Sequence, residues 1–73
     1  MTREDLTRLL RRAPFMPFTV TLRNNEVLAV ESVERMSAGR NLCTFIDTEG
    51  YVLLIPYQAI NYVALKDSPD EIL

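Results

Sequence analysis

The hydrophobic pattern at the start of the chain predicts a short amphipathic helix. Its apolar positions follow the spacing i, i+3, i+4, i+7 of one helical face: Leu6, Leu9, Leu10 and Ala13. Thr2 stands where an N-cap is expected, and Asp5 completes a shortened capping box three residues later. Pro14 ends the helix, because the residue before a proline is pushed out of the helical region.

From Phe18 onward the pattern changes to a period of two, which is typical of half-buried strands. The pattern and the turn residues predict five strands, at 18–23, 26–33, 42–46, 51–55 and 60–65. The connections are an Asn24-Asn25 turn, a loop at 34–41 around Gly39, a turn at 47–50 and a tight corner at 56–59. We therefore expect a mainly β fold, in which one helix precedes a strongly bent, five-stranded antiparallel small barrel.

The length of 73 residues allows one domain, which we place at 1–66, followed by an acidic flexible tail at 67–73. A core of this size supplies little stability, so small domains often add a disulfide, a metal or a second subunit. Cys43 is the only cysteine and histidine is absent, so the sequence predicts neither an internal disulfide nor a metal site. It predicts no cofactor either, and a homo-oligomer is the remaining source of stability.

The formal net charge of −2 argues against a non-specific nucleic-acid coat, although the arginines leave room for a local basic patch. No apolar run is long enough to span a bilayer, so we expect no membrane contact. The charged N-terminal helix is unlike a signal peptide, and a single cysteine suits a reducing compartment. These features favour a cytoplasmic protein.

Three segments carry a resemblance to a known family. The stretch Ile55-Pro56-Tyr57-Gln58-Ala59-Ile60-Asn61-Tyr62-Val63 has apolar residues at the spacing of Ile-Arg-Gly-x-x-Ile-x-x-Ile. Val20 to Asn25 resembles a strand that runs into an Asn-Gly turn, and Glu34-Arg35-Met36-Ser37 is a loose form of Asp-x-Met-Asn. Together with the element order, these segments resemble the Sm-like (Hfq-like) family of small β-barrels. An SH3-like barrel is the nearest alternative, and Pro14 to Phe18 also resembles short bacterial proteins that carry Pro-Phe-x-Pro-Phe before a hairpin.

The Sm-like resemblance implies a ring of five to seven subunits that binds single-stranded RNA. The implied RNA contacts are the corner residues Tyr57 and Gln58 and, in the opposing loop, Met36, Arg40 and Asn41. Tyr57 could instead pack on the end of the barrel or against a neighbouring subunit. Arg8, Arg11 and Arg12 share one side of the helix and could bind phosphates or form an ordinary solvated face. Pro56-Tyr57 replaces the family's Arg-Gly, and Tyr57-Gln58 replaces the Lys-His of the Hfq-like form. These replacements favour an alternative, a structural or protein-interaction barrel without nucleic-acid binding.

The last two predicted strands indicate how subunits could meet. Tyr51 to Ile55 and Tyr62 to Leu65 are continuous apolar runs, whereas a strand with one solvated face should alternate with polar residues. We therefore predict that both faces are covered, in part by another subunit, through Val52, Leu54, Tyr62 and Ala64. Glycine-rich phosphate loops and nucleophile–histidine pairs are absent, so the sequence does not predict an enzyme.

Overall fold

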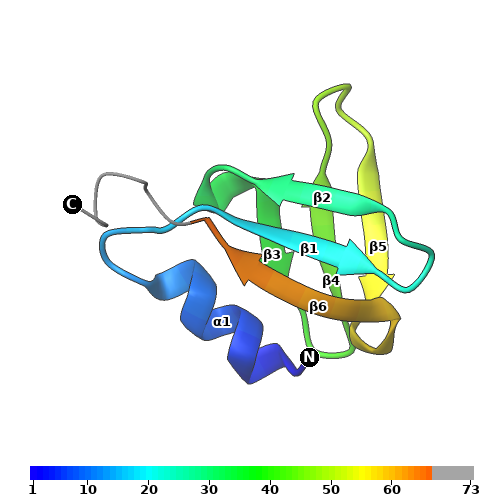
Figure 1. Cartoon of the computed structure of the whole chain (residues 1–73), viewed down its shortest axis with the longest axis horizontal. Coiled ribbons are helices and arrows are strands. Elements are labelled where there is room, and N and C mark those ends of the chain that lie inside the picture. Colours follow the sequence, from blue (N-terminus) through cyan, green and yellow to red (C-terminus); the bar gives the residue numbers. More distant parts are fainter. Residues whose placement is uncertain (67–73) are drawn as a thin grey trace.

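The computed structural model describes residues 1–66, in which one helix precedes six strands in two antiparallel sheets (Figure 1). The first sheet has the order β2-β1-β6 and contains β1 (Phe18–Leu22), β2 (Val27–Val30) and β6 (Ile60–Leu65). The second has the order β3-β4-β5 and contains β3 (Met36–Ala38), β4 (Leu42–Ile46) and β5 (Val52–Pro56). The prediction of a mainly β domain with an N-terminal helix is confirmed. The predicted acidic tail, 67–73, lies outside the described residues.

The predictions of five strands and of a single barrel are wrong. The predicted strand 26–33 stops at Val30, where the polar pair Glu31-Ser32 leads into a 3-10 turn, η1 (Val33–Arg35). A sixth strand, β3, then begins at Met36, inside the predicted loop 34–41. Because η1 separates β2 from β3, the two strands join different sheets, and each sheet keeps two edge strands.

The helix α1 (Arg3–Arg11) begins with the predicted capping box. The Thr2 hydroxyl accepts a hydrogen bond from the Asp5 amide at 3.2 Å, and the Asp5 carboxylate accepts one from the Thr2 amide at the same distance. The Thr2 hydrogen bonds lower the pKa of Asp5. Leu6 on the apolar face is fully buried, so the helix is fastened to the core at that point.

Two turns form at the predicted places because their residues tolerate a positive φ. Asn25 adopts φ 72° in a three-residue loop, Arg23 to Asn25. The Leu22 amide closes this loop by donating a hydrogen bond to the Glu26 carbonyl at 2.8 Å. The loop is thus one residue longer than the predicted Asn24-Asn25 turn. Gly50 adopts φ 92°, and the Asp47 carboxylate accepts bonds from the amides of Glu49 and Tyr51, each at 2.9 Å.

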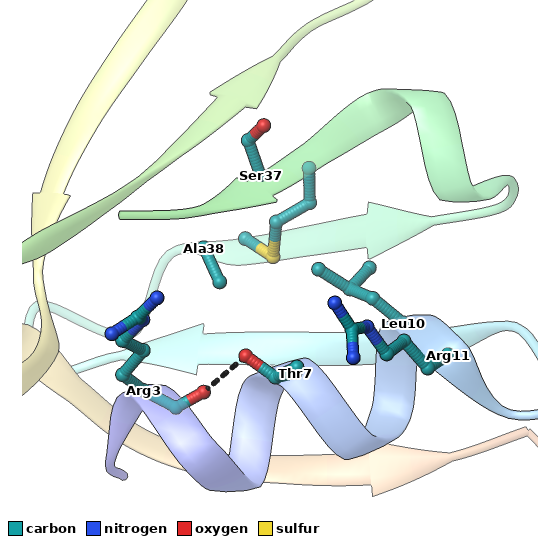
Figure 2. A pocket seen from close by; sticks show the side chains of 7 residues that line it. Arg3, Thr7, Leu10, Arg11, Ser37 and Ala38 are labelled. Carbon is teal, nitrogen blue, oxygen red and sulfur yellow. Dashed lines mark hydrogen bonds between the residues drawn. The ribbon is translucent and has the colours of Figure 1, made fainter. Parts of the chain in front are cut away.

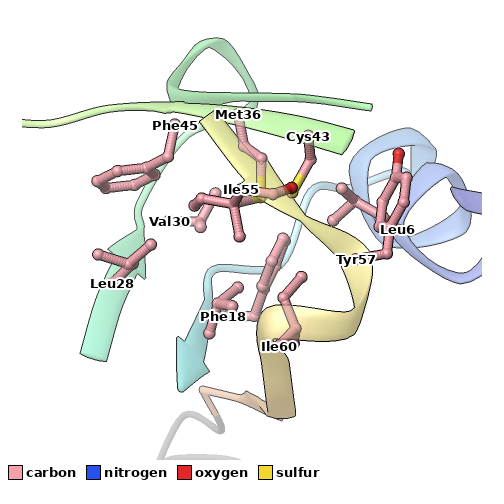
Figure 3. Packing of buried hydrophobic residues seen from close by; sticks show 11 residues of the cluster. Leu6, Phe18, Leu28, Val30, Met36, Cys43, Phe45, Ile55, Tyr57 and Ile60 are labelled. Carbon is pink, nitrogen blue, oxygen red and sulfur yellow. The ribbon is translucent and has the colours of Figure 1, made fainter. Parts of the chain in front are cut away.

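Side chains from all six strands, the helix and the corner before β6 share one hydrophobic core (Figure 3). Its buried members are Leu6, Phe18, Val20, Leu28, Val30, Met36, Cys43, Phe45, Ile55, Tyr57 and Ile60. Phe15, from the link after the helix, packs against Phe18 with ring centroids 6.0 Å apart. The two sheets are therefore held together by side-chain packing, while their edge strands lie at the periphery.

Candidate interaction surfaces

The corner between β5 and β6 is a 3-10 turn, η2 (Tyr57–Ala59), in which the predicted RNA-stacking residue is buried. Tyr57 is 8% exposed, and its hydroxyl donates a hydrogen bond to the carbonyl of Gly39. Burial raises the pKa of Tyr57. Gln58 is exposed, and its main-chain carbonyl accepts a bond from the guanidinium of Arg23. The structure therefore offers no aromatic face at this corner for a base to stack on.

The thiol of Cys43 is fully buried in the core. It donates a weak hydrogen bond to the Ile55 carbonyl at 3.5 Å. Burial raises the pKa of Cys43, which leaves the thiol protonated at neutral pH. Cys43 is therefore a packed core residue of the described fold.

The structure brings together only two of the predicted RNA contacts in the loop and on the helix. Met36 is buried at the start of β3, while Arg40 and Asn41 are exposed in the turn between β3 and β4. Arg8, Arg11 and Arg12 are exposed on α1 and at its C-cap. Met36 and Arg11 line one common hollow, whereas Arg8, Arg12, Arg40 and Asn41 do not line it.

That hollow, the α1–β3 groove, lies between the helix and strand β3 and has a volume of about 250 Å³ (Figure 2). It is lined by Arg3, Thr7, Leu10 and Arg11 from α1 and by Met36, Ser37 and Ala38 from β3. A second hollow, on the helix surface, has a volume of about 380 Å³ and is lined by Arg3, Glu4, Thr7, Arg8 and Arg11. Sequence analysis did not include Arg3 or Thr7 among the candidates. Their spacing with Arg11, at i, i+4 and i+8, places them on one helical stripe. The second wall of the groove is β3, a strand that the sequence did not predict.

The four predicted interface residues are all exposed on edge strands. Val52 is 57% and Leu54 66% exposed on β5, which pairs only with β4 within residues 1–66. Tyr62 is 58% exposed on β6, which pairs only with β1 there, and Ala64 is exposed on the same strand. These side chains alternate with the inward-facing Leu53, Ile55 and Val63. Each of the two strands therefore presents both an unpaired main-chain edge and outward apolar side chains.

Charged residues distinguish the four strand edges. Strand β2 lies directly between Glu26 and Glu31, and β3 follows Arg35 and is followed two residues later by Arg40. From Tyr51 to Leu65, in contrast, no residue is charged. Charged side chains at sheet edges are a common means of preventing unwanted pairing. Lys66 directly follows β6, so β5 is the edge strand with no charged residue next to it, and neither β5 nor β6 has a charge at both ends.

Residues 1–66 contain neither a group of metal-binding side chains nor a membrane-spanning helix. No cluster of three or more histidine, cysteine, aspartate or glutamate side chains that could hold a metal ion occurs there. No helix in that part of the chain is long and apolar enough to cross a membrane.

Comparisons with protein-family models, with curated proteins and with solved structures found no match to this chain. The Sm-like resemblance consequently depends on the residues quoted for it above.

Proposed function

We propose that this protein is a non-catalytic interaction module that assembles head to tail into a closed homo-oligomeric ring. The observation that carries the proposal is the pair of edge strands, β5 and β6, which have unpaired main-chain groups, exposed apolar side chains and no charge. An edge of this kind is a template for pairing with another chain. Pairing β5 of one subunit with β6 of the next would satisfy both edges at once.

The side chains on the two strands suit such a junction. Val52 and Leu54 would lie on the same face of the joined sheet as Tyr62 and Ala64 of the next subunit. Aromatic–aliphatic pairs across neighbouring strands contribute roughly 0.2–1 kcal/mol each, and the ladder hydrogen bonds add to this. Because the contact joins two different edges, it repeats from subunit to subunit and must close by rotation, or it would continue as a filament. The Sm-like resemblance favours closure.

Hydrogen exchange at two protein concentrations tests which edges pair. Amides of β5 and β6 are expected to exchange slowly at the micromolar concentrations where the ring forms. They should exchange faster after dilution far enough to separate the subunits. The edge strand β2, which is bracketed by Glu26 and Glu31, is the internal control and should show no concentration dependence. Concentration-independent exchange in β5 and β6 would count against pairing through these strands.

Single-stranded RNA is a second candidate ligand, favoured by the exposed arginines Arg8, Arg11 and Arg12 on the helix. An RNA site of this kind would neutralise phosphates, so binding of short oligouridine should weaken steeply as salt is raised. The buried ring of Tyr57 gives this candidate no base-stacking partner at the corner. The geometry therefore supports an interaction module better than an RNA-binding one.

A further inference from the structure

The α1–β3 groove has a positive charge at each end. Arg3 and Arg11 are eight residues apart on α1, which corresponds to about 12 Å along a helix axis. Both are exposed, and the groove is lined by no carboxylate. The single salt bridge among residues 1–66 joins Lys66 to Glu31 at 3.4 Å, so neither guanidinium has an acidic partner in that part of the chain. The groove therefore favours an anionic ligand.

The opposite wall of the groove is a strand edge. Strand β3 pairs only with β4 in the described sheet, with Ser37 opposite Thr44 and Ala38 opposite Cys43. The Gly39 amide donates to the Leu42 carbonyl at 2.9 Å, and hydrogen-bonded pairs alternate along an antiparallel ladder. The main-chain groups of Met36 and Ala38 consequently point away from β4, at the open edge of the sheet.

The side chains leave this edge accessible. The Ser37 side chain points away from the helix, so Ser37 contributes main chain to the groove (Figure 2). Thr7 donates its hydroxyl to the Arg3 carbonyl at 2.8 Å, which keeps that side chain against the helix. Leu10 provides an apolar surface beside Arg11, at one end of the groove (Figure 2). The groove thus combines strand-pairing groups, an apolar patch and two cations.

We propose that the α1–β3 groove binds an extended acidic peptide, which adds to β3 as a further strand and pairs two of its carboxylates with Arg3 and Arg11. An extended strand advances about 3.3 Å per residue, so acidic residues at i and i+4 are about 13 Å apart on one face, close to the arginine spacing. The residue at i+2 would lie near Thr7, whose hydroxyl is already bonded to the Arg3 carbonyl, so its side chain has no polar partner there and is expected to be apolar. No aromatic side chain lines the groove, and sequence-tolerant binding of single-stranded nucleic acid depends on such rings, so a peptide is favoured over RNA.

Fluorescence anisotropy with a labelled Glu-Thr-Leu-Thr-Glu peptide, capped at both ends, tests the charge requirement. The peptide is expected to bind, and the version with glutamine in place of both glutamates is not. Arg3→Gln and Arg11→Gln should each weaken binding by about tenfold, the loss of one charge-assisted hydrogen bond. Arg12→Gln is the matched control, because Arg12 lies on the helix C-cap outside the groove. Equal binding of the glutamine peptide, or an equal loss with Arg12→Gln, would overturn the proposal.

Methylation of the peptide's main-chain nitrogens tests strand addition without changing the protein. Methyl groups on the alternate nitrogens that face β3 should abolish binding, whereas methyl groups on the other nitrogens should leave it unchanged. Equal effects from both patterns would reduce the site to simple charge attraction and refute strand addition. Oligouridine is the competing ligand, and stronger binding of oligouridine through Arg3 and Arg11 would assign the groove to nucleic acid instead. Peptide binding should persist in a monomeric Leu54→Lys variant, because the groove lies on β3 and not on β5.

Discussion

Replacing Tyr57 by alanine is expected to lower the free energy of unfolding by about 3–5 kcal/mol, as for other large aromatic residues removed from a core. The ring is 8% exposed, and Figure 3 shows it beside Leu6, where it joins the helix to the two sheets. A loss of this size is comparable with the whole stability of a small single core. Urea unfolding followed by circular dichroism measures it directly.

The matched variant Tyr57→Phe separates the ring from its hydroxyl. It keeps the packing but removes the donor to the Gly39 carbonyl, which should cost roughly 0.5–1.5 kcal/mol because Gly39 is exposed and water can replace the hydroxyl. The Sm-like resemblance alone leads to a different expectation, in which Tyr57→Ala weakens RNA binding in a folded protein. A Tyr57→Ala variant as stable as the native protein would contradict the buried position.

Two singly blocked variants should fail to assemble alone and should pair when they are mixed. Leu54→Lys places a charge on β5, and Tyr62→Lys places one on β6. Both side chains are exposed in the single chain, so the fold should survive. In a head-to-tail assembly, each variant keeps one functional edge. The first retains β6 and the second retains β5, so their mixture should give a 1:1 heterodimer.

Light scattering of each variant and of the mixture measures this result. Val27→Lys is the control, because Val27 is 58% exposed but lies on β2, and its assembly should equal that of the native protein. Two monomers that stay apart on mixing would exclude a β5–β6 junction. An unchanged assembly in either single variant would show that the corresponding edge is not used.

Local signals explain which parts of the fold were predictable from the sequence. Thr2 and Asp5 begin the helix, and Asn25 and Gly50 occupy positive φ in the turns, through interactions within a few residues. Strand β3 was missed because Met36 to Ala38 is too short to display a period of two, and the neighbouring Arg35, Gly39 and Arg40 are typical of a loop. Its formation depends on pairing with β4, which is a tertiary interaction.

The candidate sites also divide into features that local sequence predicts and features that depend on tertiary contacts. The exposure of Val52, Leu54 and Tyr62 was predictable. In a continuous apolar run every second side chain points away from the core, so some apolar side chains must lie on the outer face. Packing of Tyr57 on the barrel end was one of two interpretations of the sequence, but its hydrogen-bond partner was not predictable, because Gly39 lies eighteen positions earlier in the chain. The pairing of Arg3 with Arg11 around a groove also requires β3 as the opposite wall. The sequence therefore indicated the exposed apolar strands better than the groove beside the helix.

Sedimentation equilibrium of the native protein at micromolar concentration tests the central proposal, that β5 and β6 close a ring of identical subunits. The proposal predicts a single species of several chains, five to seven as the Sm-like resemblance implies, whose mass is that multiple of 8.4 kDa and stays constant across the micromolar concentrations measured. Closure accounts for the constancy, since a ring has no remaining edge to extend. A species of 8.4 kDa at every concentration would contradict the proposal.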